Sequence, residues 1–110
     1  MKHFDSVSQL TIAQIQAAVC SEWQIDAHEM RSFRRGKDVS LARQTAIYLA
    51  RELTLLSYPG IARAFGRADH TSILWAVNRV SQRMVDDPAY AVRVIALRNQ
   101  LDAPELVEEF

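Results

Sequence analysis

Apolar residues recur at helical spacing over most of the chain, most regularly in its middle. The apolar positions there step by four, three, four and three residues, while Arg43, Gln44 and Arg51 fall outside the stripe. This spacing predicts an amphipathic helix with one face directed to a core. The stripe consists of Ala42, Ala46, Leu49, Leu53 and Leu56. We therefore expect this helix to be the centre of the fold.

Two capping patterns predict two helices before the central one. The capping pairs are Thr11 with Gln14 and Asp26 with Glu29. Each pair has the spacing of a capping box, in which two side chains satisfy free backbone N–H groups at a helix start. We expect the first helix to end near Trp23 and the second around Phe33. The segment 34–38 then predicts a polar link, because Gly36 and a run of charges weaken helix formation.

Three further helix starts follow the central helix. Ser57 suits the N-cap of a short helix with Pro59 in its first turn and Gly66 at its end. Asp69 can cap a fifth helix, and Asp87, which precedes a proline, a sixth. The expected inward residues are Ile73, Val77, Val80 and Met84 in the fifth helix and Tyr90, Val94, Leu97 and Leu101 in the sixth. Without any alternating apolar run, the pattern predicts an all-α fold of six helices.

Length and composition agree with one small domain. The chain has 110 residues, of which 49% are hydrophobic, and we expect a core over about 8–101 and a loose acidic tail over 102–110. No apolar run reaches the roughly 20 residues that a membrane span needs, and no signal peptide is visible. We therefore expect a cytoplasmic protein. Cys20, the single cysteine, has no partner for a disulfide or a metal, and no cofactor is expected.

The net charge of zero hides an uneven distribution. Residues 31–83 hold ten basic against three acidic residues, a net charge of +7, whereas 1–30 carry −3 and 84–110 carry −4. A basic module between acidic flanks is typical of a phosphate-binding face, although a solvated helix surface would look the same.

The stretch 57–84 predicts a helix-turn-helix, because a short helix, a turn opened by Gly66 and a longer helix follow one another. In this motif the second helix enters the major groove and reads base edges with its N-terminal residues. The side of the longer helix that faces away from the core carries groups suited to a groove. They are His70, Thr71, Ser72, Trp75, Asn78, Arg79, Gln82 and Arg83.

The segments RQTAIYLARELTLLSYPGIARAFG and FGRADHTSILWAVNRV resemble the C-terminal DNA-binding domain, domain IV, of the bacterial replication initiator DnaA. The resemblance covers roughly 8–101. It implies a six-helix bundle with a helix-turn-helix of the Trp repressor kind. It also implies binding of double-stranded DNA at a short asymmetric site, the DnaA box, with the helix in the major groove and a basic loop in the minor groove.

The resemblance and the residue chemistry together give the predicted base contacts. They are Arg35, Asp69, His70, Thr71, Ser72, Trp75 and Ala76. Arginine suits a narrow A·T-rich minor groove, an acidic side chain accepts from cytosine, and a threonine methyl contacts thymine. Other interpretations remain: Asp69 as an N-cap, His70 and Arg35 as solvated groups, Trp75 as packing and Ala76 as helix filler. Ser72 stands where the family usually has a second threonine, so the hydroxyl remains but a methyl contact to thymine is lost, and we expect a site that differs from a standard DnaA box.

A second group of residues is predicted to contact phosphates. It consists of Arg34, Lys37, Arg43, Gln44, Arg51, Pro59 and Arg79. Arg43 and Gln44 are expected in the first turn of the long helix, where free N–H groups and the helix dipole favour an anion. Arg63, Arg67 and Arg83 are further candidates of lower rank.

These residues predict a sequence-specific DNA-binding protein, and an ATPase domain of the kind that a complete initiator needs does not fit in the chain. A free-standing DNA reader would regulate transcription, or else control replication by occupying DnaA boxes at an origin. A helical protein-interaction adaptor without DNA binding is a further alternative. The scattered histidines His3, His28 and His70 and the lack of a glycine-rich phosphate loop argue against an enzyme. Leu106, Val107 and Phe110 in the acidic tail suit a contact with the transcription machinery or another protein.

Overall fold

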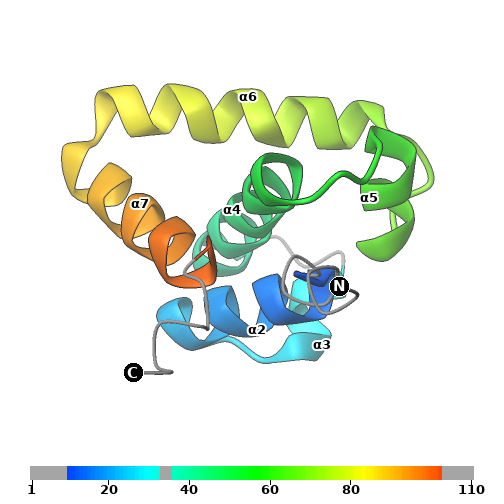
Figure 1. Ribbon diagram of the computed structural model, residues 1–110, viewed down its shortest axis with the longest axis horizontal. Coiled ribbons are helices and arrows are strands. Elements are labelled where there is room, and N and C mark those ends of the chain that lie inside the picture. Colours follow the sequence, from blue (N-terminus) through cyan, green and yellow to red (C-terminus); the bar gives the residue numbers. More distant parts are fainter. Residues whose placement is uncertain (1–9, 33–35, 103–110) are drawn as a thin grey trace, which may run out of the picture.

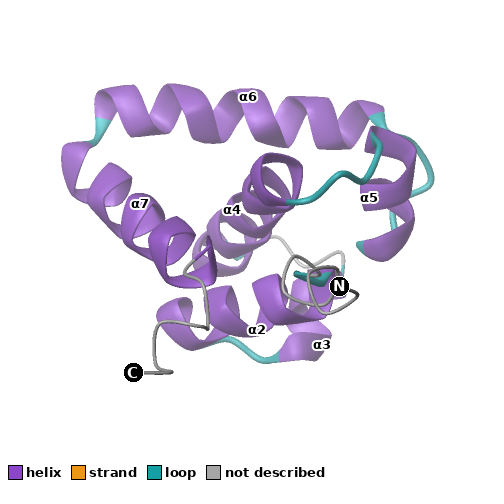
Figure 2. Cartoon of the chain, viewed as in Figure 1, coloured by secondary structure: helices purple, strands orange, loops and turns teal. Residues whose placement is uncertain are grey.

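The computed structural model describes residues 10–32 and 36–102, which form six helices and no strand (Figures 1 and 2). The helices are α2 (Ile12–Trp23), α3 (Ala27–Arg31), α4 (Lys37–Leu53), α5 (Tyr58–Ala64), α6 (Thr71–Asp86) and α7 (Pro88–Asp102). The predicted all-α fold is confirmed. No helix within these residues is long and apolar enough to cross a membrane.

The central helix of the fold is α4, which contacts each of the other five helices. Figure 1 shows α4 crossing the middle of the molecule, with α6 along one side and α2 and α3 along the other. Ala42, Ala46 and Leu49 are fully buried, as the apolar stripe predicts. They pack with Phe65 and Ile73 from the helix-turn-helix in one continuous core, so the orientation of α6 is set by the core itself.

The predicted caps of the first two helices are confirmed. Thr11 accepts a hydrogen bond from the Gln14 backbone N–H at 3.1 Å, and the Gln14 side chain accepts from the Thr11 N–H at 2.9 Å. The same reciprocal pair joins Asp26 and Glu29. α3 ends at Arg31 rather than around residue 33, which lies outside the described residues together with Arg34 and Arg35.

Two predicted boundaries of the long helix are wrong. α4 begins at Lys37, directly after Gly36, so the polar link is shorter than expected. It ends at Leu53, and Leu56 lies in the following connection with 39% of its surface exposed. The sixth helix runs through Asp102, and residues 103–110 lie outside the described part of the chain, so the loose acidic tail stays a prediction.

Candidate nucleic-acid interface

The helix-turn-helix consists of α5, a short turn and α6. Ser57 caps α5 by accepting a hydrogen bond from the Gly60 N–H at 3.1 Å, as predicted. The turn after α5 uses Gly66, whose φ of +71° lies in the left-handed region that favours glycine. Arg67 then donates its backbone N–H to the Ala62 carbonyl at 2.7 Å, which closes the turn. The chain therefore enters α6 in one fixed direction.

One side of α6 is packed and the other is open. Ile73, Ala76 and Val80 are buried against the core. The exposed residues, other than the apolar Leu74 and Val85, are polar, aromatic or basic, and they are Thr71, Ser72, Trp75, Asn78, Arg79, Ser81, Gln82 and Arg83, followed by Asp86 at the helix end. No acidic residue occurs between 71 and 85. This side of α6 is therefore suited to an anionic groove.

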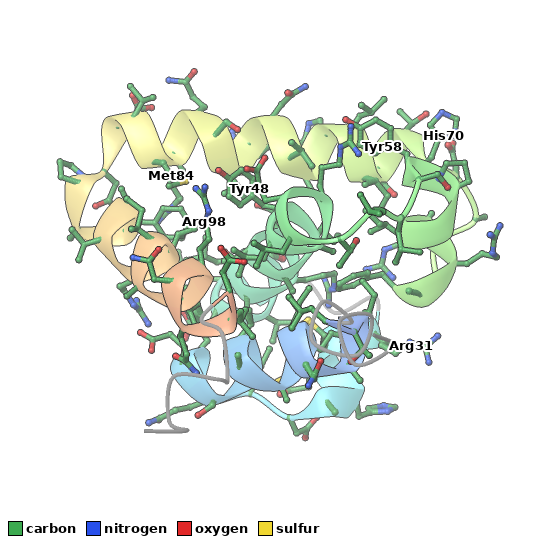
Figure 3. All side chains as sticks on the ribbon, in the orientation of Figure 1. Arg31, Tyr48, Tyr58, His70, Met84 and Arg98 are labelled. Atoms are coloured by element: carbon green, nitrogen blue, oxygen red, sulfur yellow. The ribbon has the colours of Figure 1, made fainter. Side chains whose placement is uncertain are left out.

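Asp69 and His70 lie at the beginning of α6. Asp69 Oδ1 accepts a hydrogen bond from the Thr71 backbone N–H at 2.8 Å, although the helical backbone starts at Thr71 and His70 is the residue directly before it. The hydrogen bonds with Thr71, that of the backbone first, lower the pKa of the Asp69 carboxyl. His70 is exposed, and Figure 3 shows it at the outer end of α6. His70, not Asp69, is the N-cap residue of α6, so the prediction of Asp69 as the N-cap is corrected. Asp69 instead holds the first turn from one residue further out, through a turn of the Asx type, and its side chain remains open to solvent.

Trp75 and Arg79 form a stacked pair on the exposed face of α6. The Arg79 Cζ atom lies 5.4 Å from the centroid of the Trp75 ring, within the range of a cation–π contact. Trp75 has 55% of its surface exposed, so most of its side chain is not packed in the core.

The structure corrects two predicted DNA contacts, of which Arg43 is the first. Arg43 and Gln44 both lie in the second turn of α4, not in the first as predicted, and Arg43 is only 8% exposed. Its Nε donates to the Met30 carbonyl and its Nη2 to the Glu29 carbonyl, both at 3.1 Å. Its pKa is lowered by burial and by the charge of Arg67. These hydrogen bonds hold the end of α3 against α4. The prediction that Arg43 contacts a DNA phosphate is therefore corrected.

Ala76, predicted to contact a base, is the second residue whose predicted role the structure corrects. Only 2% of its surface is exposed, because its methyl group packs into the core between α4 and α6. A methyl group in this position cannot reach a thymine. The helix geometry explains the difference, because Ala76 is three residues after the buried Ile73 and four before Val80, and so lies on the same side of α6.

A shallow crevice of about 140 Å³ lies between α4 and α6. It brings together Ser40 and Gln44 from α4 with Ser72 and Trp75 from α6. The other lining residues are the buried Arg43, Ile47 and Ala76 and the half-buried Arg67. Gln44 is half-buried and also lines a second crevice of about 230 Å³ with Arg79, Gln82 and Arg83. Gln44 therefore lies between the two crevices, beside α6.

The other predicted phosphate contacts are spread around the helix-turn-helix. Lys37 is exposed at the first residue of α4, and Pro59 is exposed in the first turn of α5. The Arg51 guanidinium lies over the Tyr58 ring, 4.5 Å from its centroid. Arg34 and Arg35 lie outside the described residues. Among residues 10–32 and 36–102, no three His, Cys, Asp or Glu side chains are grouped so that they could hold a metal ion.

Sequence reasoning missed the structural role of Arg67. Its guanidinium donates to the Phe65 and Ser32 carbonyls, both at 3.2 Å. The Ser32 acceptor is 35 residues away in the sequence, and a backbone carbonyl carries no residue signal. Nothing in the local pattern could have identified this contact.

Comparison with known proteins agrees with this geometry. The family model described as bacterial DnaA protein helix-turn-helix matches residues 12–80, which include α2 to α5 and most of α6. The chain belongs to this family. The matched residues include the whole of α4 and the turn at Gly66.

Curated DnaA relatives and one solved structure match nearly the whole chain. It is 44% identical over 94 residues to the chromosomal replication initiator protein DnaA of Gluconobacter oxydans, covering 86% of this chain and 20% of that protein. It is 41% identical over 95 residues to DnaA of Sphingopyxis alaskensis, covering 86% and 21%. A crystal structure of a DNA replication initiation factor superposes with a TM-score of 0.77 at 28% identity, over 92% of this chain and 31% of that one. The chain spans about a fifth of the length of these curated relatives.

Proposed function

We propose that the chain binds double-stranded DNA in a sequence-specific manner, with α6 in the major groove. The observation that carries this proposal is the exposed face of α6, which presents hydroxyl, aromatic, amide and guanidinium groups without an acidic residue between 71 and 85. Major-groove readers place the N-terminal residues of such a helix at base edges. Membership in the DnaA helix-turn-helix family supports this use of α6.

The residues at the start of α6 are proposed to make different contacts with DNA. His70, Thr71 and Ser72 are exposed at the N-terminal end, where they would meet base edges. Asp69 holds the first turn through Thr71 and has a carboxylate that could accept from a cytosine amino group. Trp75 would cover base edges or sugars one turn further along. This division predicts that the first turn of α6 provides specificity.

Phosphates would be held by the groups around this turn. Lys37, Arg51, Pro59 and Arg79 are exposed, and Gln44 lines the crevices beside α6. Arg34 and Arg35 are proposed to contact a phosphate and the adjacent minor groove. Support for this comes from Ser32, which is bonded to the helix-turn-helix through Arg67, so the basic segment starts beside the motif.

The proposed biological consequence is regulation of transcription by occupancy of DnaA-box-like sites. Control of replication by occupancy of origin sites is the second candidate, and the names of the matched relatives, which are replication initiators, favour it. Mapping of occupied sites across the genome separates the two. Peaks upstream of genes support transcription, and a dominant cluster at the origin supports replication control.

A DNA reader of this kind needs no catalytic residue, so we propose that the chain is not an enzyme and acts in the cytoplasm on the nucleoid. A protein partner, such as the transcription machinery, would bind outside the α6 face. The adaptor alternative requires that the α6 face has no preference for DNA.

The test is selection of duplexes from a random pool, followed by fluorescence anisotropy with the selected and a scrambled duplex. If five to seven phosphates are neutralised, log K should fall with log salt with a slope of about −5. His70→Ala and Thr71→Ala should weaken binding to the selected duplex much more than to the scrambled one. Arg79→Ala should weaken both alike. A slope near zero, or no selected sequence, would refute the proposal.

A further inference from the structure

Helix α7 is apolar on two opposite sides. Its inner side packs Tyr90, Val94 and Leu97 into the core. Its outer side presents Val92 and Ile95 to solvent, with 66% and 45% of their surfaces exposed. The exposed residues on this side form the outer stripe, which consists of Pro88, Ala89, Val92, Ile95, Ala96 and Asn99. A helix with apolar residues on all sides is typical of a buried position, so the outer stripe is suited to a partner.

The two arginines of α7 lie beside the outer stripe and not in it. Arg93 donates from its Nε to the Glu22 carboxylate of α2 at 2.8 Å, and its guanidinium lies over the Trp23 ring, 4.2 Å from the centroid. Arg98 is close to Tyr48 of α4 (Figure 3). Burial raises the pKa of the Tyr48 hydroxyl, and the charge of Arg98 partly offsets that rise. Because no residue of the outer stripe is charged, its partner must present an uncharged surface of similar length.

A second copy of α7 has the surface that the outer stripe requires. A two-fold contact uses the same surface on both copies. In an antiparallel pair centred on Val92, Ala89 of one copy lies opposite the larger Ile95 of the other, so a small side chain makes room for a large one. The same register brings Arg98 toward Asp86, at the corner between α6 and α7, and not toward another arginine. The outer stripe is therefore complementary to itself in size and in charge.

The outer stripe is too small to hold two copies together in solution. The 15 residues of α7 span about 22 Å, and one side of a helix is about 10 Å wide. This surface is far smaller than the roughly 800 Å² per partner that a stable interface buries. Two copies on one duplex have a high effective concentration, so a weak contact suffices there.

We propose that the outer stripe of α7 is the contact between two copies of this chain bound at neighbouring, inverted sites on DNA. This inference rests on the proposed function and adds cooperation between copies to it. Figure 1 shows that α7 folds back beneath the end of α6, so it lies beside the surface that would meet DNA. Because the contact is two-fold, the two sites must be inverted repeats, whereas direct repeats do not bring the two outer stripes together.

The experiment uses duplexes with two copies of the site that the wild type selects, arranged as inverted or direct repeats. The spacing is varied one base pair at a time over one helical turn. Gel shifts give the ratio of the two stepwise affinities, corrected for the two equivalent sites. We expect the second copy to bind about tenfold more tightly than the first on inverted repeats at a preferred spacing, a coupling of ordinary size. Direct repeats should show no gain.

Variants of the outer stripe identify the surface responsible for the gain. Val92→Gln combined with Ile95→Gln should abolish it, while the affinity for a single site stays unchanged. Glutamine is neutral and a good helix former, so these changes remove apolar surface without adding charge or weakening α7. Leu55→Gln is the matched control and should keep the gain, since it removes a fully exposed leucine from the connection after α4.

Cross-linking gives an independent measurement. Val92 would lie on the two-fold axis, so Val92→Cys should form a disulfide-linked pair under mild oxidation on the inverted repeat. The wild type, whose half-buried Cys20 is the single cysteine of the chain, should remain unlinked.

Other outcomes overturn the inference and differ from failure of the proposed function. A wild type that binds single sites but shows no gain in either arrangement would refute a second copy as the partner of α7. A gain that survives Val92→Gln with Ile95→Gln, or that occurs only on direct repeats, would refute this contact. If the wild type prefers no duplex, DNA reading fails, and Val92→Cys at about millimolar protein without DNA tests the contact alone. Cross-linking no stronger than that of the wild type would then refute it.

Discussion

The guanidinium of Arg79 lies over the indole of Trp75, one helical turn earlier on the exposed face of α6, with 5.4 Å between Cζ and the ring centroid. The contact orients a large apolar surface and a positive charge in the same direction. Because Trp75 is 55% exposed, the pair forms part of the surface that α6 would bring to DNA. It adds an apolar contact beyond the hydroxyl groups of the first turn.

Replacement of Trp75 tests this arrangement. We expect Trp75→Ala to lower the affinity for the selected duplex by about tenfold, or about 1.4 kcal/mol, with a smaller loss on scrambled DNA. The free energy of unfolding should change by only about 0.5 kcal/mol, because the ring is mostly exposed. Val85→Ala is the matched control, since it shortens an apolar side chain that is 76% exposed at the far end of α6. Equal affinity of Trp75→Ala and the wild type would contradict the contact.

Asp69 should make the stability of the protein depend on pH. Hydrogen bonds with Thr71 lower the pKa of its carboxyl in the folded state, so the folded protein binds this proton more weakly than the unfolded chain. The stabilisation is complete above the ordinary aspartate pKa of about 3.9 and is lost as the pH falls through the lower, folded-state value. Thermal melts should therefore show Asp69→Ala less stable than wild type at neutral pH, with the difference disappearing in acid.

The matched variant for this test is Asp69→Asn. Asparagine keeps an oxygen that can accept from the Thr71 N–H in the same turn, but it does not titrate. Its stability relative to Asp69→Ala should persist in acid. If the difference between wild type and Asp69→Ala is the same at every pH, the carboxylate does not stabilise the start of α6.

The sequence predicted the helices well because local chemistry decides where they start. The capping pairs at Thr11 and Asp26, the Ser57 cap and the glycine turn at Gly66 all involve groups within a few residues of each other. The end of α4 was predicted less well. Leu56 continues the apolar stripe, but the chain leaves the helix after Leu53, and spacing alone contains no signal for that.

The sequence predicted which kinds of side chain form the candidate site better than it predicted which of them are buried. Residues at the exposed start of α6, such as His70 and Thr71, follow from the helix periodicity. Arg43 was assigned to the wrong role because its acceptors are carbonyls 13 and 14 residues away, on a different helix. Ala76 was assigned to the wrong side because alanine is small enough for either side, although its spacing to Ile73 and Val80 places it on the packed side of α6.

A buried hydrogen bond between α4 and α7 gives a test of the core. Thr45 Oγ1 donates its only proton to the Leu41 carbonyl at 2.7 Å, so the Tyr90 hydroxyl, 2.6 Å from the same Oγ1, must be the donor of their shared bond. Tyr90→Phe removes this bond and leaves Thr45 bonded to Leu41, and should cost about 1 kcal/mol. Thr45→Val leaves the Tyr90 hydroxyl buried without its acceptor and should cost more, about 1–3 kcal/mol.

Urea unfolding of these two variants measures the asymmetry. The DNA affinity of both should remain at the wild-type value under conditions in which they are folded, because Thr45 and Tyr90 are buried. Equal costs for the two substitutions would show that Tyr90 finds another acceptor when Thr45 is lost. The double variant should lower the free energy of unfolding by less than the sum of the two single variants, because both remove the same hydrogen bond.

Alanine should destabilise the protein at Gly66 but not at Gly36. Gly66 has a φ of +71°, so Gly66→Ala places a Cβ in the left-handed region and should cost about 1–2 kcal/mol. At Gly36, which has a φ of −53°, an alanine Cβ would meet no atom within 4 Å. Gly36→Ala reduces the entropy of the unfolded chain but removes a favourable N-cap residue, so its net effect should be close to zero. Urea unfolding of both variants checks the contrast, and a Gly66→Ala protein as stable as Gly36→Ala would show that the turn before α6 does not require glycine.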